Sequence, residues 1–328
     1  MSVDLTKYNT AAKICGLVWS TLKEMILTKQ ILDVKQLEDI GDTLINDECN
    51  KIYKREKLKG IAFPTSISLN NCMGYYLHEQ SNKEYNVIKD DDVIKIELGV
   101  NIGGCIAVLG ETIVNVKYSK YVDFLNQLQK DIVKMIVPGE TNDEIKIHIE
   151  SKCTEIGCFP VENNTSYQQL DNQLNTQESK CIITNYKKYY DEDDNVIIDN
   201  LCYEFEENEV YTINLTIIPN NNDQTDETEH VYIEPHAPHI YRCNEFYYNL
   251  KLKSSREFYS NVKNKYNTNA FSGLEYKKDV RSRIGIKESI ENGILDSYPI
   301  YYSKDNYPIF HKKFTIVVCK DKSIQLKY

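Results

Sequence analysis

The spacing of apolar residues changes along the chain, and each change predicts a different element. Two early series are spaced by three to five positions: Ile14, Val18, Leu22 and Ile26, then Leu37, Ile40, Leu44, Cys49 and Ile52. Residues at such spacing lie on one face of an α-helix. The N-terminal segment is therefore predicted to form two amphipathic helices.

Capping residues predict the limits of the second helix. Asp33 and Gln36 resemble a capping box at its start, and Gly60 suits its end. The basic run KIYKREKLK at 51–59 then falls on the last turns of that helix, where cations complement the helix dipole. A solvated helix end and a binding surface are both consistent with this placement.

Helical and strand-like segments follow one another through the rest of the chain. We expect, in order, strands over 61–116 with a hairpin turn at 101–104, a helix at 118–136, a helix from Thr141 (capped with Glu144) to Gly157, a strand at 209–218, an exposed strand at LKLKSSR (250–256) within a mainly helical segment at 250–290, and a last strand at 311–320. This mixture predicts the α/β (α+β) class.

Composition adds limits on size and location. At 328 residues and 41% hydrophobic, the chain can bury a large core. It shows no apolar run long enough to span a bilayer and no secretory signal, so we expect a cytoplasmic protein, with the nucleus as an alternative, and no membrane partner. The ten cysteines lack the paired spacing of zinc sites, and we expect free, mostly buried thiols.

Charge is unevenly distributed around a formal net value of -10. Residues 251–287 hold ten Lys or Arg against three acids, whereas 51–59 hold five bases and one acid. Residues 189–209 hold nine acids and no base. The net charge argues against general polyanion binding, but two concentrated basic segments favour one oriented contact with a structured polyanion.

Six segments together resemble the proliferation-associated, ErbB-receptor-binding protein family. They are KGIAFPTSISLNNC (59–72), IKIELGVNIGGCIA (94–107), VPGETNDEI (137–145), FEENEVYTINL (205–215), YNLKLKSSREFYS (248–260) and EYKKDVRSRIGIKES (275–289). That family is similar to type II methionine aminopeptidases. The resemblance therefore implies a pita-bread (creatinase/methionine aminopeptidase-like) fold, with residues 1–328 as a single domain and a helical, basic insert at about 241–295. The sequence ends before the Lys-rich tail of that family.

The aminopeptidases with this fold hold two metal ions through two Asp, one His and two Glu, and a second His faces the substrate. The resemblance places these positions at Glu97 and Val108 for the two Asp, Tyr167 for the metal-binding His, Asn214 and Lys313 for the two Glu, and Tyr75 for the substrate-facing His. One carboxylate survives. The resemblance thus implies degenerate positions with no catalytic residue, no metal and no cofactor.

The chemistry at these positions opposes a dinuclear site. Two adjacent divalent ions need several anionic oxygens around them. Val108 offers no ligand and Lys313 brings a positive charge, while a buried carboxylate without a partner is costly. We therefore hypothesise that Lys313 is the counter-charge of Glu97, and we expect neither enzymatic activity nor a small-molecule substrate.

Other histidines and cysteines offer weaker alternatives. His236 and His239 lie in a proline-containing segment without a third ligand nearby, and a loop role is favoured. His311 shares a strand face with Lys313 and is an alternative ligand. Cys72 and Cys105 are interpreted as buried thiols rather than nucleophiles, because no His occupies a matching motif position.

The two basic segments supply the candidate RNA- and ribosome-binding residues. They are Lys51, Lys54, Arg55, Lys57, Lys59, Lys251, Lys253, Arg256, Lys277, Lys278, Arg281 and Arg283. Interleaved aromatic residues suit contact with unstacked bases, although most of them are expected in the core: Tyr248, Phe258, Tyr259, Tyr266 and Tyr276. A solvated basic face is the alternative interpretation.

The resemblance implies a protein that binds the large ribosomal subunit near the polypeptide exit, including rRNA and exit-region ribosomal proteins. Its role would be that of a ribosome biogenesis, translation or dormancy factor. We expect a monomer whose binding weakens with salt, because phosphate contacts release counterions. Two alternatives stay open: a peptide- or protein-binding adaptor that uses the former pocket, and a residual metalloaminopeptidase.

Overall fold

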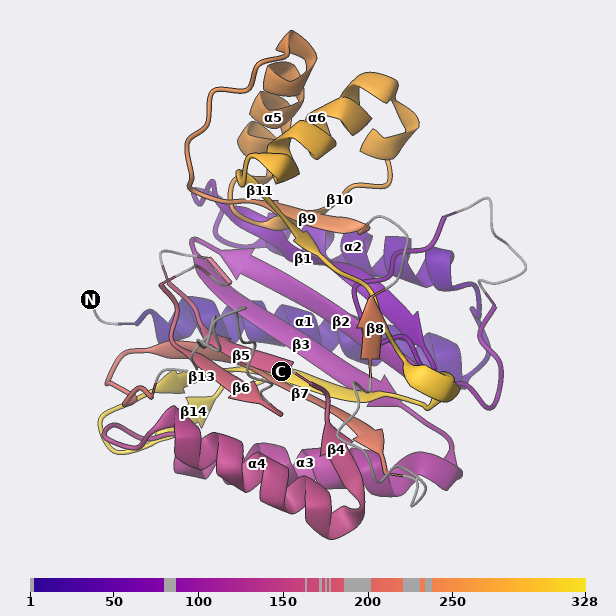
Figure 1. Cartoon of the computed structure of the whole chain (residues 1–328), viewed down its shortest axis with the longest axis vertical. Coiled ribbons are helices and arrows are strands. Elements are labelled where there is room, and N and C mark those ends of the chain that lie inside the picture. The colour runs from indigo at the N-terminus through magenta and orange to yellow at the C-terminus, as the bar shows by residue number, and fades with distance from the viewer. Residues whose placement is uncertain are drawn as a thin grey trace, which may run out of the picture.

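The computed structural model describes residues 3–79, 87–162, 164–170, 173–174, 176, 178–185, 202–220, 231–233 and 238–328. Within these ranges a nine-stranded sheet lies at the centre, and a smaller lobe projects from one end (Figure 1). The main sheet has the order β1-β2-β3-β13-β7-β5-β6, with β14 paired to β13 and β4 to β7. None of the described helices is both long and apolar enough to cross a bilayer.

The N-terminal half pairs two helices with three antiparallel strands. Its elements are α1 (Leu5–Leu27), α2 (Val34–Lys51), β1 (Lys59–Leu69), β2 (Ile94–Ile102) and β3 (Cys105–Ile113). The buried face of α1 packs on β2 and β3, and α2 packs on β1. A tight turn joins β2 to β3, with Gly103 and Gly104 both at positive φ, a conformation that glycine adopts without strain.

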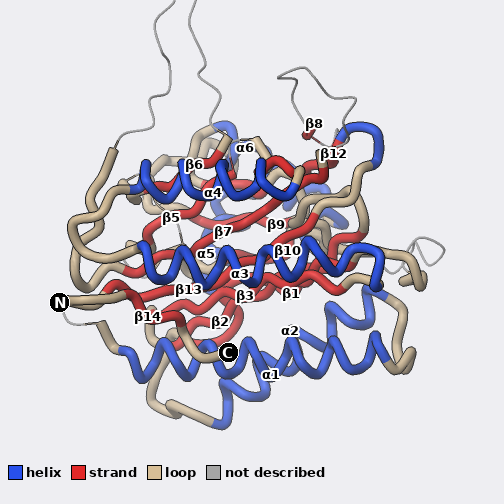
Figure 2. The backbone as a smooth tube through the Cα atoms, turned by 90° about the horizontal axis from the view of Figure 1, so that it is seen from below, coloured by secondary structure: helices blue, strands red, loops and turns tan. Residues whose placement is uncertain are grey.

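The second half repeats this arrangement with two further helices on the same face of the sheet (Figure 2). Its elements are η1 (Val116–Tyr118), α3 (Ser119–Met135), α4 (Asn142–Ile156), β4 (Cys158–Pro160), β5 (Asn164–Gln168), β6 (Cys181–Thr184), β7 (Val210–Pro219), β13 (Phe310–Val318) and β14 (Ser323–Gln325). The aromatic and branched residues of β7 and β13 that face α3 and α4 form a second core.

The lobe, here called the insert lobe, comprises residues 240–298. It holds β9 (Ile240–Cys243), α5 (Lys253–Tyr266), β10 (Ala270–Ser272), η2 (Tyr276–Lys278), α6 (Val280–Glu291) and β11 (Leu295–Tyr298). The strands form a separate sheet of order β10-β9-β11, and β10 contacts β1 of the main sheet. A short pair, β8 (Val231–Ile233) with β12 (Tyr301–Ser303), and the turn η3 (Lys304–Asn306) complete the described elements.

Alternation along the strands separates an apolar face from a polar one. On β2 the even-numbered residues from Ile94 to Ile102 pack on the helices, so Lys95 and Glu97 point to the opposite face. On β13 the same alternation places Phe310, Phe314, Ile316 and Val318 on the helices and leaves His311 and Lys313 on the opposite face. The helix-free face of the sheet therefore holds the polar residues.

Several predicted elements are confirmed. The first two helices, the hairpin turn, the helices at 119–135 and 142–156, and the strands at 210–219 and 310–318 all occur. Asp33 caps α2 through a hydrogen bond from Gln36 N–H of 2.8 Å, and Gly157 ends α4 in the left-handed conformation. Most of the acidic segment at 189–209 and His236 lie outside the described residues.

Two predictions in the basic segments are wrong. α2 ends at Lys51 rather than near Gly60, because Ile52 is extended, and most of the run 51–59 forms the loop before β1. The alternating LKLKSSR is not a strand, because α5 begins at Lys253. There the Glu288 carboxylate accepts the Lys251 N–H at 2.7 Å, a cap supplied by a distant helix.

The predicted capping box at Thr141 and Glu144 is also wrong. α4 does begin after Thr141, but the Thr141 side chain makes no capping hydrogen bond. Thr141 instead forms an isolated β-bridge with Glu204, and Asn142 accepts a hydrogen bond from Tyr203 N–H at 2.8 Å. Pairing with the segment before β7 therefore holds the start of this helix.

Candidate functional site

Strand register brings three of the predicted positions, together with Gly110, into one row across the sheet. Glu97 on β2 lies opposite Gly110 on β3, Gly110 lies opposite Lys313 on β13, and Lys313 lies opposite Asn214 on β7. Directly opposed residues project to the same face of a sheet. The row therefore lies on the helix-free face, although its members are far apart in sequence.

The predicted pairing of Lys313 with Glu97 is confirmed. Lys313 Nζ lies 2.6 Å from Glu97 Oε1, and the two side chains are only 2% and 6% exposed. Burial by itself lowers the pKa of Lys313, but the charge and hydrogen bond of Glu97, together with Tyr167 and Tyr75, outweigh burial and raise the pKa well above 10.5. Lys313 is thus charged at neutral pH, and the pair is internally neutralised.

Gly110 makes room for this pair. A β-carbon at position 110 would lie 2.7 Å from Lys313 Cβ and 2.7 Å from His311 Cε1, closer than side chains approach each other. The glycine between Glu97 and Lys313 therefore lets the long lysine side chain cross the neighbouring strand. A larger residue at position 110 would displace both His311 and Lys313 on β13.

Aromatic rings enclose the ammonium group. Lys313 Nζ lies 3.5 Å from the Tyr75 hydroxyl and above the rings of Tyr75 and Phe63, at 5.3 and 5.7 Å from their centroids. Phe63, Tyr75 and Tyr298 also contact one another, with centroid separations of 5.2 to 5.7 Å. Cation–π contact adds to the electrostatic stabilisation of a desolvated ammonium. Tyr75 thus packs beside the lysine and offers no imidazole to a substrate.

The three other degenerate positions supply no anionic ligand. Val108 lies in the apolar cluster with Tyr167, which is 8% exposed. Asn214 Oδ1 lies 2.9 Å from His311 Nε2, so these two side chains satisfy each other. Burial, followed by the charge of Lys313, lowers the pKa of His311 well below 6.5 and keeps the ring neutral.

This donor set does not fit a pair of divalent ions. The one carboxylate of the row, Glu97, is already neutralised by Lys313, whose ammonium would repel a cation. Within the ranges that the structure describes, no three His, Cys, Asp or Glu side chains gather closely enough to hold a metal ion. A metal-activated water is therefore not part of the chemistry that these residues offer.

The alternative ligands and nucleophiles have other partners. His239 Nδ1 accepts the Leu77 N–H at 3.2 Å, and His311 pairs with Asn214 as described. Cys72 and Cys105 are buried, and burial raises the pKa of both thiols, that of Cys105 to about 11. Neither thiol is poised as a thiolate at neutral pH. The prediction of free, mostly buried cysteines is confirmed.

Sequence reasoning missed a second buried lysine on the same face. Lys95 is 2% exposed, and its Nζ donates to the Asn70 carbonyl at 2.8 Å. Burial lowers the pKa of Lys95 to about 7. The helix-free face therefore holds a second buried lysine beside the former ligand positions. The place of Lys95 on the same strand, two residues before Glu97, was the available signal.

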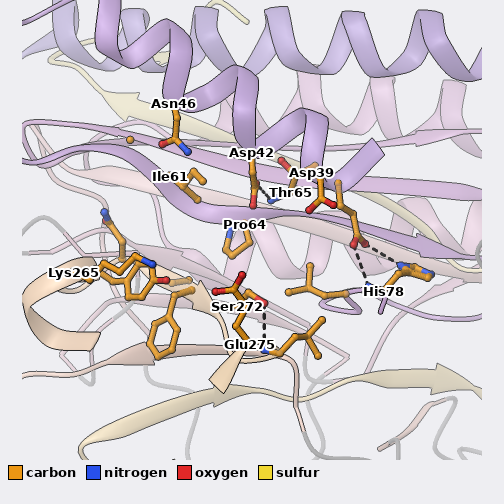
Figure 3. Close-up of a pocket in the computed structure, with 18 of the residues that line it drawn as sticks. Asp39, Asp42, Asn46, Ile61, Pro64, Thr65, His78, Lys265, Ser272 and Glu275 are labelled. Atoms are coloured by element: carbon orange, nitrogen blue, oxygen red, sulfur yellow. Dashed lines mark hydrogen bonds and ion pairs between the residues drawn. The ribbon is translucent and has the colours of Figure 1, made fainter. Parts of the chain in front are cut away.

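A groove of about 920 Å³ lies between α2 and β1 on one side and the insert lobe on the other (Figure 3). Asp39 and Asp42 project from α2, and Lys265, Ser272 and Glu275 face them from the lobe. Lys59 and Lys278 also line it, so the fold brings the two basic segments to one groove. That meeting was not predicted from the sequence.

Acids and bases are nearly balanced along the groove. The ionisable lining residues are Glu38, Asp39, Asp42, Glu79 and Glu275 against Lys35, Lys59, Lys265 and Lys278. Burial raises the pKa of Asp42 to about 6 even though the Thr65 N–H donates to it at 2.7 Å. Glu38 contacts His78 Nδ1 at 2.9 Å. Carboxylates that line the groove would repel phosphates, so the groove does not suit a polyanion.

The candidate basic residues divide into two sets. Some are committed within the protein: Lys51 pairs with Glu48 and Lys253 with Glu257, while Lys59, Arg256 and Lys277 donate to backbone carbonyls. The others are exposed and form no ion pair with any described residue: Lys54, Arg55, Lys57, Lys251, Lys278, Arg281 and Arg283. The second set is the one available to a partner.

Most of the interleaved aromatic residues pack inside the insert lobe, as expected. Phe258 is 5% exposed, and Tyr259, Tyr266 and Tyr276 pack against the same cluster. Tyr248 alone of the five is exposed, and its neighbours Phe246 and Tyr247, which sequence reasoning did not single out, are 54% and 92% exposed. The run of three aromatic residues just before a basic segment was the missed signal.

The fold and the sequence are similar to those of known proteins. The chain is 27% identical to ERBB-3 binding protein 1 of Arabidopsis thaliana over 97% of this chain and 79% of that protein. It is 29% identical to proliferation-associated protein A of Dictyostelium discoideum over 96% and 80%. The predicted resemblance is thus confirmed.

Solved structures show the same fold. A thermophilic Arx1 superposes with a TM-score of 0.80 at 22% identity, over 99% of this chain and 91% of that one. A methionine aminopeptidase of Thermotoga maritima gives a TM-score of 0.56 at 12% identity, over 98% and 95%. The predicted pita-bread fold is confirmed. The model of metallopeptidase family M24 matches residues 6–236, and the chain belongs to that family.

Proposed function

We propose that this protein has no peptidase activity. We propose further that it binds the large ribosomal subunit through exposed basic residues of the insert lobe and of the loop before β1. The observation on which the proposal depends is the buried Lys313–Glu97 pair, which occupies the row where the related enzymes hold their metal ligands. The likeness to ERBB-3 binding protein 1 and to Arx1 supports it.

The distribution of charge supports the binding surface. Lys278, Arg281 and Arg283 are exposed on η2 and α6, and no described acid lies within ion-pair distance of them. Unpaired cations on a protein of net charge -10 direct one face of the molecule toward a polyanion, while the acids elsewhere disfavour other orientations. rRNA and exit-region ribosomal proteins are the proposed partners, in the cytoplasm or the nucleus, for a monomeric protein.

Co-sedimentation with ribosomes tests this surface. We expect the triple variant Lys278→Glu, Arg281→Glu and Arg283→Glu to lose most of its binding at moderate salt. The matched control reverses three exposed lysines of α3 at the opposite end of the molecule: Lys120, Lys130 and Lys134. Both variants change net charge equally, so equal binding by the two would contradict the assignment of the surface.

Peptidase activity has its own test. Incubation of the purified protein with cobalt or manganese and a peptide that begins with methionine is expected to release no methionine, because Lys313 opposes cation binding in the row. Metal-dependent turnover that Glu97→Gln abolishes would overturn the proposed loss of activity.

The groove supports a second candidate function, the binding of a peptide. Its volume of about 920 Å³ and its mixed carboxylates and lysines suit a chain of mixed charge. On this alternative, Leu274→Glu on the groove wall would abolish binding, whereas reversal of Arg281 and Arg283 would not. The opposite pattern would exclude it.

A further inference from the structure

We infer that Phe246, Tyr247 and Tyr248, here called the aromatic loop, form a platform that stacks on an unpaired base of single-stranded or looped RNA. The inference rests on the proposed ribosome binding and names the chemistry of one contact. It differs from the basic surface in what it recognises, because phosphate contacts are present in any nucleic acid, whereas stacking requires a base outside a duplex.

The exposure of these three side chains sets them apart. Tyr247 is 92% exposed, Phe246 54% and Tyr248 36%, and they are consecutive. Contiguous exposed aromatic groups are uncommon on a protein surface without a partner, because each leaves apolar area in water. The neighbouring rings of the same lobe are packed in its core, so the exposure belongs to this loop alone among the aromatic residues of the lobe.

Both ends of the loop are held in place. At the start, the Asn244 amide donates to the Gly293 carbonyl at 2.6 Å and to Asp296 at 3.0 Å, and Lys263 Nζ donates to the Asn244 carbonyl at 3.0 Å. The Phe246 N–H donates to Asn244 Oδ1 at 3.0 Å. The chain just before the exposed rings is therefore held in place by these hydrogen bonds.

The far end is fixed by buried and charged groups. Leu250 is 3% exposed, the Arg256 guanidinium donates to the Leu250 and Lys251 carbonyls at 2.7 and 2.8 Å, and Glu288 accepts the Lys251 N–H. A loop held at both ends presents its rings without a large loss of conformational freedom on binding, which favours a contact surface.

Charge next to the loop selects the partner. Lys251 follows the loop, is exposed and has no ion-pair partner among the described residues, and just beyond it lie Lys253, which pairs with Glu257, and Arg256, which donates to backbone carbonyls. A base stacked on Tyr247 would place its own phosphates near these cations, the arrangement by which sequence-tolerant proteins hold single strands. An apolar protein surface would gain nothing from the cations, so RNA is the occupant that the charge favours.

A small cavity beside Phe246 offers room for the edge of a base. Its volume is about 330 Å³, and Phe246 lines it together with Arg242, Asn244 and the three acids Glu178, Glu245 and Asp296. Amide and carboxylate groups there can meet the polar edge of a base whose face lies on a ring. The aromatic loop and this cavity therefore form one continuous surface.

Fluorescence anisotropy with a labelled RNA strand of about ten nucleotides, and with a blunt duplex of the same sequence, tests the platform. We expect the triple change of Phe246, Tyr247 and Tyr248 to Ala to weaken binding of the single strand about tenfold, in line with the loss of stacking, and to leave duplex binding nearly unchanged. Replacement of the same residues by Leu should weaken it similarly, because leucine keeps apolar area but has no π face.

A 2-aminopurine in the strand adds a direct readout of stacking. Its fluorescence should fall on binding to the unaltered protein and not on binding to the Leu variant. The control Ile147→Ala removes a comparably exposed apolar side chain from α4, 63% exposed, and should change nothing. Circular dichroism verifies that all variants are folded.

The outcomes separate the two proposals. If the Leu variant binds the single strand as well as the unaltered protein does, the platform is an apolar protein contact and the inference is wrong. If ribosomes bind the basic surface but the Ala variant binds RNA normally, the inference alone fails. If the unaltered protein binds neither ribosomes nor RNA, the proposed function fails with it.

Discussion

The centre of the sheet and the insert lobe both hold basic side chains, but they differ in how those charges are compensated. Lys313 is 2% exposed and has Glu97 at 2.6 Å, whereas Arg281 and Arg283 are exposed and have no acidic partner among the described residues. In the interior an uncompensated charge would be expelled or neutralised. At the surface water solvates it, so it stays available for a partner.

This difference shows why the same residue type has opposite roles in one chain. A buried lysine beside a glutamate satisfies an internal requirement and removes a binding site. Exposed cations in the insert lobe contribute little to stability, because surface charge is screened by solvent and salt. We therefore expect changes at the sheet centre to affect folding, and changes in the lobe to affect binding.

The largest expected effect follows the removal of Lys313. Lys313→Met leaves Glu97 buried without a partner and should lower the free energy of unfolding by about 3–5 kcal/mol. Urea denaturation followed by circular dichroism measures the change. The double variant Lys313→Met and Glu97→Leu should recover most of the loss, because an apolar pair needs no counter-charge. A single variant as stable as the unaltered protein would show that the pair is not required.

A binding effect of intermediate size is expected from changes in the insert lobe and not from changes at the sheet centre. Reversal of Lys278, Arg281 and Arg283 to Glu should weaken ribosome binding about 10–100-fold at moderate salt while unfolding stays nearly unchanged. The slope of log affinity against log salt should become shallower by about 2, since fewer counterions are released. Sedimentation across a salt series measures both quantities. An unchanged slope would place the phosphate contacts elsewhere.

A smaller effect of the opposite sign is expected at Lys95. Burial lowers its pKa from 10.5 to about 7, so between these values the unfolded chain binds the proton that the folded chain lacks, and folding stability rises with pH. Lys95→Met should therefore stabilise the protein by about 1–2 kcal/mol at pH 7. The stability gained by Lys95→Met should shrink as the pH rises from the folded pKa of Lys95 toward its unfolded pKa. Denaturation at two pH values tests this, and a destabilised variant at pH 7 would contradict it.

The smallest effect concerns acid sensitivity at His311. Its folded pKa lies well below 6.5, so its contribution to stability is present above pH 6.5 and is lost as the pH falls below that value. The charges of Lys313, Lys95 and Lys312 also oppose protonation of the ring, and Asn214, which contacts the ring, cannot neutralise a protonated imidazole. His311→Gln should match the unaltered protein at pH 7 and exceed its stability by about 1 kcal/mol near pH 5. Parallel acid titrations that coincide would refute this.

Sequence reasoning succeeded where a local pattern determines the structure. The series through Ile14 and Ile26, the Asp33 cap and the Gly157 end of α4 are local features, and each occurs. The pairing of Lys313 with Glu97 was also predictable, because the resemblance placed both residues in one former site and a buried carboxylate requires a counter-charge.

Local patterns failed where distant segments compete with them. The basic run at 51–59 leaves the helix at Ile52 because β1 must begin at Lys59 to pair with β2. The alternation in LKLKSSR is overridden by Glu288 of α6, which accepts the Lys251 N–H, and by Arg256 of the segment itself, which donates to the Leu250 carbonyl. The spacing of residues within a segment does not reveal these tertiary contacts.

The sequence by itself determined the amphipathic helices and the alternating strands, because these depend on residue type and on neighbours in the chain. The absence of an anionic ligand set at the degenerate positions followed from residue type once the family resemblance had located those positions. The tertiary structure alone decided which rings are buried and which are exposed, that Gly110 opens a path for Lys313, and that Lys59 and Lys278 meet across one groove. Those features depend on strand register and on the packing of the insert lobe, which join residues that are far apart along the chain.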